Sequence, residues 1–205
     1  MPLIFHKNIS NGRNLLLWHL IEDEHHLIQL VDLDQSELTE LESISLIKRR
    51  KEWLGTRLLV KMAAQGKKLN FLPNGKPMLD STTHISISHN DDLGGVIIAP
   101  DAVGLDIQDK NEKLKKISLR FCAESERHDA ANSPDELQYI TILWCVKEAV
   151  FKCYGEHVDF DRHIKVLPFN LNDEWINAEY NGLHGSKSFV LRHLKMNGRH
   201  VLVTM

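Results

Sequence analysis

Three charged side chains stand out because their types and spacing could hold a metal ion and an anion. Asp106 lies in "AVGLDIQ", whose alternating pattern predicts a β-strand with Gly104, Asp106 and Gln108 on one face. Glu148 and Lys152 lie in "WCVKEAVFK", which predicts a helix that places both on one stripe. Carboxylates from a strand and a helix that meet at one cleft can hold Mg²⁺, which prefers oxygen ligands.

The Glu148–Lys152 spacing has a simpler interpretation, because an acid four residues before a lysine stabilises a helix by itself. The neighbouring residues oppose that interpretation. Most of this helix is apolar, and a charged group on a well-packed helix is costly unless it faces a cleft with a partner. The apolar positions are Leu143, Trp144, Val146, Ala149, Val150, Phe151 and Tyr154. We therefore expect the charged stripe to face a cleft.

A second group of candidates comes from a basic stretch, Lys48 to Lys76, which carries a single acid, Glu52. The whole chain has a net charge of −3, so this local excess favours one anionic partner over a general affinity for nucleic acid. A solvated helix face is the alternative. Two later segments offer further anion-binding groups: "NGKPML" presents Lys76 on a turn, and "SISH" ends in a hydroxyl and an imidazole.

The elements that must position these residues follow from periodicity. A hairpin with a turn at Asn11-Gly12 is followed by helices over Glu24–Gly66 and strands at 84–89, 94–100 and 102–108. Helices over Lys110–Ala123 and Ser133–Tyr154 precede strands at 187–194 and 199–205, joined at Asn197-Gly198. This order predicts an α+β fold with two pseudo-symmetric halves, 1–102 and 103–205. Each half is a small antiparallel sheet packed with a long helix.

Composition limits the class of protein. The 205 residues are 42% hydrophobic and 26% charged, with no apolar run of about 18 residues and no signal-peptide pattern at the N-terminus. The three cysteines, Cys122, Cys145 and Cys153, have no CxxC spacing, and the twelve histidines form no zinc motif. We expect a cytoplasmic protein with reduced, buried thiols and no membrane partner.

Several of these segments together resemble a known family. "VGLDIQ", followed about forty residues later by "WCVKEAVFK", is similar to the signature of the 4′-phosphopantetheinyl transferases. The blocks "KRRKEWLGTRLL", "NGKPML", "ISISHN" and "RFCAESE" also match in order, so the resemblance spans roughly Lys48 to Tyr154. The length resembles the monomeric two-half type that activates peptide synthetases. The resemblance implies transfer of phosphopantetheine from coenzyme A to a serine of an acyl or peptidyl carrier protein, releasing adenosine 3′,5′-bisphosphate.

The resemblance also implies a role for each candidate, with the active site in a cleft between the halves. Asp106, Gln108 and Glu148 would hold Mg²⁺ in the C-terminal half, and Glu148 would accept the serine proton, while Lys152 would contact the pyrophosphate. The N-terminal half would bind coenzyme A, and Glu126 matches a further family acid. The groups expected to contact coenzyme A in that half are Arg50, Arg57, Gly75, Lys76, Pro77, Ser88 and His89.

Gln108 departs from the family pattern, which has a glutamate at this position. A carboxamide removes one negative charge and should weaken Mg²⁺ binding. An alternative hypothesis follows: a non-catalytic module that binds coenzyme A or a carrier protein. A nucleic-acid-binding protein that uses the basic helix is a third hypothesis, but the acidic remainder and the lack of interleaved aromatic residues argue against it. Carrier proteins are typically acidic, so the basic stretch would steer them.

Overall fold

The computed structural model describes residues 3–10, 12–64, 66–154, 158–182 and 185–205. The chain divides into two compact units, Met1–Asp101 and Ala102–Met205. Both units combine helices with antiparallel sheets, so the predicted α+β class is confirmed. The expected cleft between two halves stays a prediction.

The first unit is built on a four-stranded antiparallel sheet of order β1-β2-β6-β5. The strands are β1 (Leu3–Ser10), β2 (Arg13–His19), β5 (His84–Asn90) and β6 (Leu93–Ala99). At the predicted turn Gly12 has a φ of +77°, which suits glycine, whereas Asn11 lies outside the described residues. The predicted hairpin is therefore present as the β1–β2 pair.

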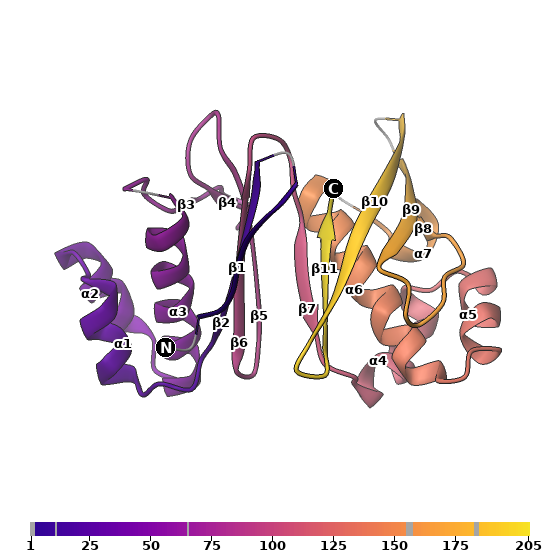
Figure 1. Cartoon of the computed structure of the whole chain (residues 1–205), viewed down its shortest axis with the longest axis horizontal. Coiled ribbons are helices and arrows are strands. Elements are labelled where there is room, and N and C mark those ends of the chain that lie inside the picture. Colours follow the sequence, from indigo (N-terminus) through magenta and orange to yellow (C-terminus); the bar gives the residue numbers. More distant parts are fainter. Residues whose placement is uncertain (1–2, 11, 65, 155–157, 183–184) are drawn as a thin grey trace. The chain divides into compact units, whose positions relative to one another are not determined.

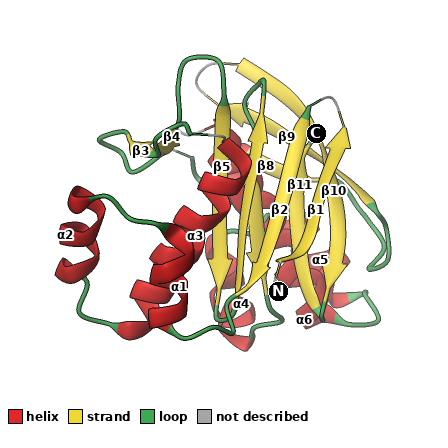
Figure 2. Ribbon diagram, turned by 60° about the vertical axis from the view of Figure 1, so that its left-hand side comes forward, coloured by secondary structure: helices red, strands yellow, loops and turns green. Residues whose placement is uncertain are grey.

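Three helices cover one face of this sheet, with α3 next to the strands (Figure 1). The predicted helical region resolves into α1 (Glu24–Val31), α2 (Gln35–Ser43) and α3 (Ile47–Ala64). Asp34 caps α2 in a reciprocal capping box with Glu37. In Figure 2, α2 stands apart from α1 and α3 on connecting loops. It buries only Leu41, so packing alone holds it weakly.

A small hairpin and strand β5 complete this unit. The turn-rich segment forms β3 (Asn70–Phe71) and β4 (Pro77–Met78), a two-stranded sheet. Strand β5 differs from expectation, because alternation predicted one buried and one exposed face. Ser86 and Ser88 are nevertheless 2% and 5% exposed. Hydroxyls are small and hydrogen-bond readily, so an alternating Ile/Ser pattern does not distinguish a half-buried strand from a fully buried one.

The second unit has a five-stranded antiparallel sheet of order β7-β11-β10-β9-β8. The predicted strands appear as β7 (Leu105–Gln108), β10 (Gly185–Met196) and β11 (Arg199–Thr204), with Asn197 and Gly198 at positive φ in the predicted turn. Strands β8 (Ile164–Val166) and β9 (Trp175–Gly182) were not predicted. β8 has only three residues, too few for a periodic pattern to register.

The long helix α6 (Glu136–Tyr154) lies along one face of this sheet, and α4 and α5 pack against it (Figure 1). The single helix expected over Lys110–Ala123 was wrong in extent. It is a short α4 (Glu112–Ile117) and a 3₁₀ turn (Ser118–Arg120), and α5 (Glu124–Ala131) follows. A short α7 (Phe160–His163) precedes β8. Interruptions of this kind arise from tertiary packing and leave little trace in local propensity.

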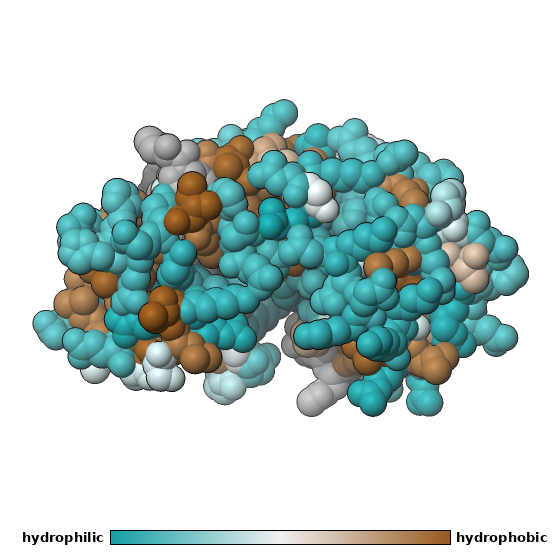
Figure 3. Space-filling view, turned by 90° about the horizontal axis from the view of Figure 1, so that it is seen from below, coloured by the Kyte–Doolittle hydropathy of each residue, from teal (hydrophilic) through white to brown (hydrophobic). Residues whose placement is uncertain are grey.

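Each unit has its own hydrophobic cluster, one around α3 and β6, the other around α6 and its sheet. All three cysteines are buried free thiols, as expected. None of the helices in the described ranges has the length and apolarity needed to cross a bilayer. The face drawn in Figure 3 is mostly hydrophilic with scattered hydrophobic residues.

Candidate functional site

The second unit brings Asp106 against the middle of α6. Gly104, just before β7, explains how: a Cβ there would lie 1.8 Å from the Ala149 carbonyl oxygen. Only glycine permits this approach of strand backbone to helix backbone. The β7 strand therefore runs directly alongside the helix turn that carries Glu148 and Lys152. Asp106 is 3% exposed on this strand.

Asp106 is held by two side-chain donors. The ammonium of Lys152 lies 2.7 Å from Asp106 Oδ1 and also donates to the Leu105 carbonyl at 3.1 Å. The Nε2 group of Gln108 donates to Asp106 Oδ2 at 3.1 Å. One carboxylate oxygen thus accepts from the expected pyrophosphate-binding lysine, and the other accepts from the expected third metal ligand. Both interactions are charge-assisted and fix the carboxylate in place.

Glu148 lies close enough to Asp106 for the two carboxylates to repel each other. Burial and, second, the Asp106 charge raise the pKa of Glu148 to about 7, and Lys152 partly opposes the rise. Two like charges at one buried place favour protonation of one of them. Glu148 is therefore the group in this cluster whose pKa lies near neutral pH, while the Asp106 carboxylate keeps its contacts with Lys152 and Gln108.

Cys145 lies beneath this cluster and was not predicted to contribute to it. Its thiol is fully buried beside Asp106, and burial and that carboxylate both raise its pKa well above the usual range. It also lies 3.7 Å from the carbonyl oxygen of His200. A thiol that stays protonated here is a weak donor that needs no counter-charge. The place of Cys145 in the sequence motif did not indicate that it would lie beside Asp106.

The donor set of Asp106, Gln108 and Glu148 suits a hard divalent cation. Among the described residues, no group of three or more His, Cys, Asp or Glu side chains is placed to hold a metal ion. Asp106 and Glu148 supply two repelling carboxylates, an arrangement that a cation relieves. Gln108 directs its NH₂ group toward Asp106, and turning the amide would present its oxygen instead. The residues therefore fit Mg²⁺ with two carboxylates and one neutral oxygen.

Glu126, the further acid of the family resemblance, lies elsewhere. It is 2% exposed and its Oε2 lies 2.8 Å from Nζ of Lys147, which is 0% exposed. This ion pair lies inside the core of the second unit, on another side of α6. Adjacent residues on a helix point about 100° apart, so Lys147 and Glu148 face different surroundings although they are neighbours in sequence.

In the first unit, the two arginines expected to bind phosphates are engaged by acids. Arg50 Nη2 lies 2.6 Å from Glu24, and its Nη1 donates to the Leu41 carbonyl at 2.8 Å. Arg57 Nη2 lies 2.7 Å from Glu40, and its guanidinium lies 3.3 Å from the centroid of the Trp53 ring. A phosphate could reach either guanidinium only by competing with these carboxylates.

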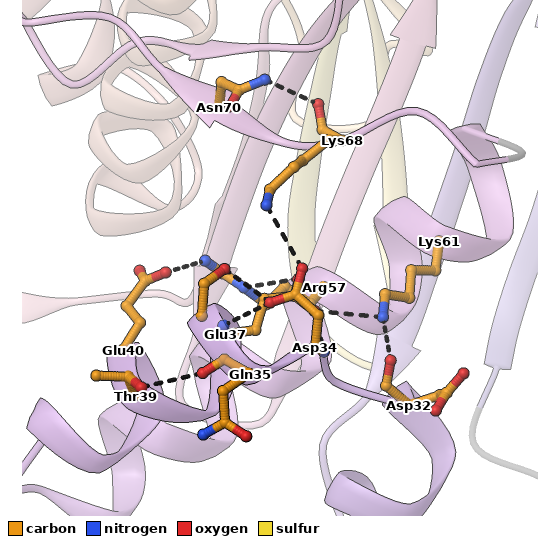
Figure 4. Close-up of polar contacts among 11 residues, drawn as sticks. Asp32, Asp34, Gln35, Glu37, Thr39, Glu40, Arg57, Lys61, Lys68 and Asn70 are labelled. Carbon is orange, nitrogen blue, oxygen red and sulfur yellow. Dashed lines mark hydrogen bonds and ion pairs between the residues drawn. The ribbon is translucent and has the colours of Figure 1, made fainter.

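These contacts belong to a network that fastens α2 to α3, drawn in Figure 4. Glu37 faces both Arg57, at 3.6 Å, and Lys61, at 3.4 Å, while Lys68 lies 3.4 Å from Asp34. Much of the basic excess expected from the sequence is thus balanced within the same unit. The acids precede the basic stretch in sequence, and only the tertiary structure brings them onto it.

The remaining coenzyme candidates occupy a turn and a strand. Gly75 has a φ of +82° and its N–H donates to the Leu72 carbonyl at 2.8 Å, which presents Lys76 and Pro77 on the β3–β4 hairpin. Ser88 and His89 lie near the end of β5. Nδ1 of His89 is 3.7 Å from Oε2 of the buried Glu52 on α3. The Glu52 carboxylate of α3 therefore faces this imidazole.

The structure therefore groups the candidates within each unit. In the second unit Asp106, Gln108, Glu148 and Lys152 converge, whereas Glu126 does not join them. In the first unit His89 faces α3, and the two arginines hold neighbouring helices. Two contributors were missed: Cys145, and the Lys147 side chain as the partner of Glu126. A lysine in a nearly continuous apolar helix was the available signal for the second.

Comparisons with known proteins agree with the geometry of the second unit. A family model described as "4'-phosphopantetheinyl transferase superfamily" matches residues 102–204. The chain is 34% identical over 93 residues to "4'-phosphopantetheinyl transferase psf-1" of Bacillus pumilus, covering 42% of this chain and 39% of that protein. It is 34% identical over 86 residues to "4'-phosphopantetheinyl transferase gsp" of Aneurinibacillus migulanus, covering 40% and 35%. The matches thus span well under half the length of either relative.

Proposed function

Because the chain belongs to the 4′-phosphopantetheinyl transferase superfamily, we propose that it transfers phosphopantetheine from coenzyme A to a serine of a carrier protein. The serine Oγ would form a bond to the phosphorus that carries the pantetheine arm. The bond from that phosphorus to the bridging oxygen would break, and adenosine 3′,5′-bisphosphate would leave. The serine proton would need an acceptor. Acyl and peptidyl carrier proteins are the proposed partners.

The observation that carries the proposal is the meeting of Asp106, Glu148 and Lys152. One anionic carboxylate, one carboxyl group with a pKa of about 7 and one ammonium lie together at the boundary of β7 and α6. Phosphoryl transfer depends mainly on positioning and on stabilising charge at the phosphorus and the leaving oxygen. These three groups supply an anchor for a cation, a proton acceptor and a positive charge.

Glu148 is the proposed general base. A base works best when its pKa lies near the working pH, because it is then both available and able to take the proton. Burial and the Asp106 charge raise its pKa to about 7. Its partial exposure leaves a route for the serine hydroxyl or for one bridging water.

Asp106 and Lys152 are proposed to act on the diphosphate side. Bound at Asp106, Gln108 and Glu148, Mg²⁺ would neutralise charge on the pyrophosphate. Lys152 holds Asp106 at 2.7 Å and lies on a flexible four-carbon stem. It can therefore exchange the carboxylate for a phosphate oxygen without leaving the site. Gln108 keeps the second Asp106 oxygen oriented.

The first unit is proposed to bind the nucleotide portion of coenzyme A. His89 is proposed from its place near the end of β5, and Lys76 from the Gly75 turn that presents it. Ser88 and Pro77 are proposed from the same hairpin and strand. Arg50 and Arg57 have a weaker basis, since acids of α1 and α2 already hold them.

Mass spectrometry tests the function. Apo-carrier proteins of the fatty acid, polyketide and peptide synthetase classes would be incubated with the protein, coenzyme A and Mg²⁺. We expect the mass of one phosphopantetheine group to be added to a serine of at least one carrier. Wild-type protein that modifies none of them, in a reaction where a known transferase modifies all, would overturn the proposal.

The Gln108–Asp106 hydrogen bond favours a second candidate, a non-catalytic module that binds coenzyme A or a carrier protein. A carboxamide that donates to Asp106 competes with a cation for that oxygen. Calorimetry separates the two candidates. Coenzyme A binding that is unaffected by Mg²⁺, together with no turnover, would favour the module, whereas binding strengthened by Mg²⁺ favours the enzyme.

A further inference from the structure

The buried pair Glu126–Lys147 is unusually complete for charged groups without solvent. The three ammonium hydrogens of Lys147 have three acceptors: Glu126 Oε2, and the carbonyls of Phe160 and Ile164. Glu126 Oε1 accepts from Val166 N at 2.8 Å, and its Oε2 accepts from Ala123 N at 2.8 Å. The groups that surround Lys147 of α6 come from α5 and the residue before it, from α7 and from β8.

Stability alone gives little reason for such a pair. Removing two charges from water costs several kcal/mol per ion, and apolar replacements of a buried ion pair are often neutral or stabilising. What a buried pair supplies is geometry, since its hydrogen bonds are directional and apolar contacts are not. The question is then which geometry the protein needs at this point of α6.

The apolar surface of α6 only weakly determines how the helix is rotated about its own axis. Buried residues follow one another along the helix with few breaks: Tyr139, Ile140, Thr141, Ile142, Leu143, Cys145, Val146, Lys147, Ala149, Val150 and Cys153. A helix buried around most of its circumference has no narrow apolar stripe that selects one orientation about its axis. Lys147, with fixed partners on α5, α7 and β8, selects one.

Glu148 and Lys152 depend on that orientation. Glu148 follows Lys147 directly, and Lys152 lies five positions on, so any rotation of α6 about its axis moves both relative to β7. The Lys152 contacts at Asp106 Oδ1 and the Leu105 carbonyl would be the first to lengthen.

We propose that Glu126 and Lys147 are positioning residues that set the rotation of α6, and thereby hold Glu148 and Lys152 against Asp106. The catalytic importance of that set rests on the proposed function, whereas the geometric claim does not. The pair touches neither substrate nor metal. It acts through Glu148 and Lys152.

The double variant Glu126→Gln/Lys147→Met tests the proposal, because it removes both charges and leaves no buried charge unpaired. We expect the variant to fold, the kcat of phosphopantetheine transfer to fall about 10- to 100-fold, and the KM for coenzyme A to change less than twofold. A pair that serves stability alone would leave kcat near the wild-type value at any temperature where the variant is folded.

A spectroscopic measurement on the protein without coenzyme A or metal provides the second readout. The Leu105 carbonyl and the Asp106 N–H belong to one peptide group, so loss of the Lys152 hydrogen bond should shift the Asp106 amide resonance in ¹H–¹⁵N spectra. Ile140→Val is the matched control. Ile140 is buried on the same stripe of α6, two turns before Lys147, and trimming it costs stability without removing a directional contact.

We expect β7 resonances to move in the double variant and not in Ile140→Val. Unshifted Asp106 and Ile107 resonances with an unchanged kcat in the double variant would overturn the proposal. If wild-type protein proves inactive toward every carrier protein, the proposed function fails, and the β7 resonances still decide whether the pair positions α6.

Discussion

Two lysines on α6 occupy opposite extremes of environment. Lys147 is fully buried, and its ammonium bonds Glu126 and two backbone carbonyls. Lys152 pairs with Asp106 at a similar distance, but its side chain is 27% exposed and a second carboxyl group, Glu148, lies nearby. The two ion pairs measure 2.8 and 2.7 Å, so the bond length does not distinguish them.

What distinguishes the pairs is whether the charges balance locally. Around Lys147, one ammonium meets one carboxylate, and the remaining positions are filled by backbone groups. Around Lys152, one ammonium meets two acids, and burial together with the Asp106 charge raises the pKa of Glu148 to about 7. A balanced buried pair is suited to structure, whereas an unbalanced, partly exposed set is suited to binding a cation or moving a proton.

The largest effect should come from the unbalanced set. Glu148→Gln removes the proposed base while keeping the shape of the side chain. We expect the rate of transfer to fall about 10²- to 10⁴-fold, the usual contribution of a positioned base, with no loss of stability. Carrier-protein modification followed by mass spectrometry measures the rate, and thermal unfolding measures the stability. A variant that keeps more than a tenth of wild-type activity would assign the base elsewhere.

The two lysines themselves provide the next test. Lys147→Met leaves the Glu126 charge buried and unpaired, so we expect the free energy of unfolding to fall by about 3–5 kcal/mol. Lys152→Met leaves the Asp106 carboxylate with its Gln108 hydrogen bond, next to a position that is 27% exposed, and should cost less, about 1–3 kcal/mol. Urea denaturation of both variants makes the comparison. Equal losses in the two would show that burial does not separate the pairs.

The pKa of Glu148 makes stability depend on pH. Burial and Asp106 raise the folded-state pKa to about 7 from the ordinary 4.5, so the folded protein holds this proton more tightly than the unfolded chain. This contribution is complete below about pH 4.5 and is lost as the pH rises through about 7, a change of about 3 kcal/mol.

Measuring unfolding of wild-type protein and Glu148→Gln across this pH range, in Mg²⁺-free buffer, isolates the contribution. We expect the wild type to lose stability relative to the variant as the pH rises. Parallel curves for the two proteins would mean that Glu148 titrates normally. Glu148→Gln leaves the Glu126–Lys147 pair intact, so any contribution of that pair is the same in both proteins.

The smallest effect should come from adding a negative charge beside Asp106, Glu148 and Lys152. Gln108→Glu supplies a third carboxylate, and we expect Mg²⁺ to bind about tenfold more tightly by calorimetry, since hard cations gain from each added charge. Gln108→Ala is the control and should bind no more tightly than the wild type. Equal Mg²⁺ affinity for Gln108→Glu and wild type would count against a cation at this position.

Particular residues show what sequence reasoning could reach. The stripe of Glu148 and Lys152 and the strand that carries Gly104 and Asp106 on one face follow from short-range periodicity. The pairing of Glu126 with Lys147 does not, since 21 positions separate them and the intervening α5–α6 turn decides the contact. Arg50 and Arg57 show the same limit, because the acids that hold them come from separate helices.

The sequence by itself determined the α+β class, the placement of the main helices and strands, and the residue types able to handle a diphosphate. These depend on patterns within a few residues, where side-chain spacing and backbone propensity act directly. Only the tertiary structure decided which charges are balanced. Charge interactions depend on distance and burial, which the fold sets. Lys147 therefore pairs with a single buried acid, whereas Lys152 lies beside two acids.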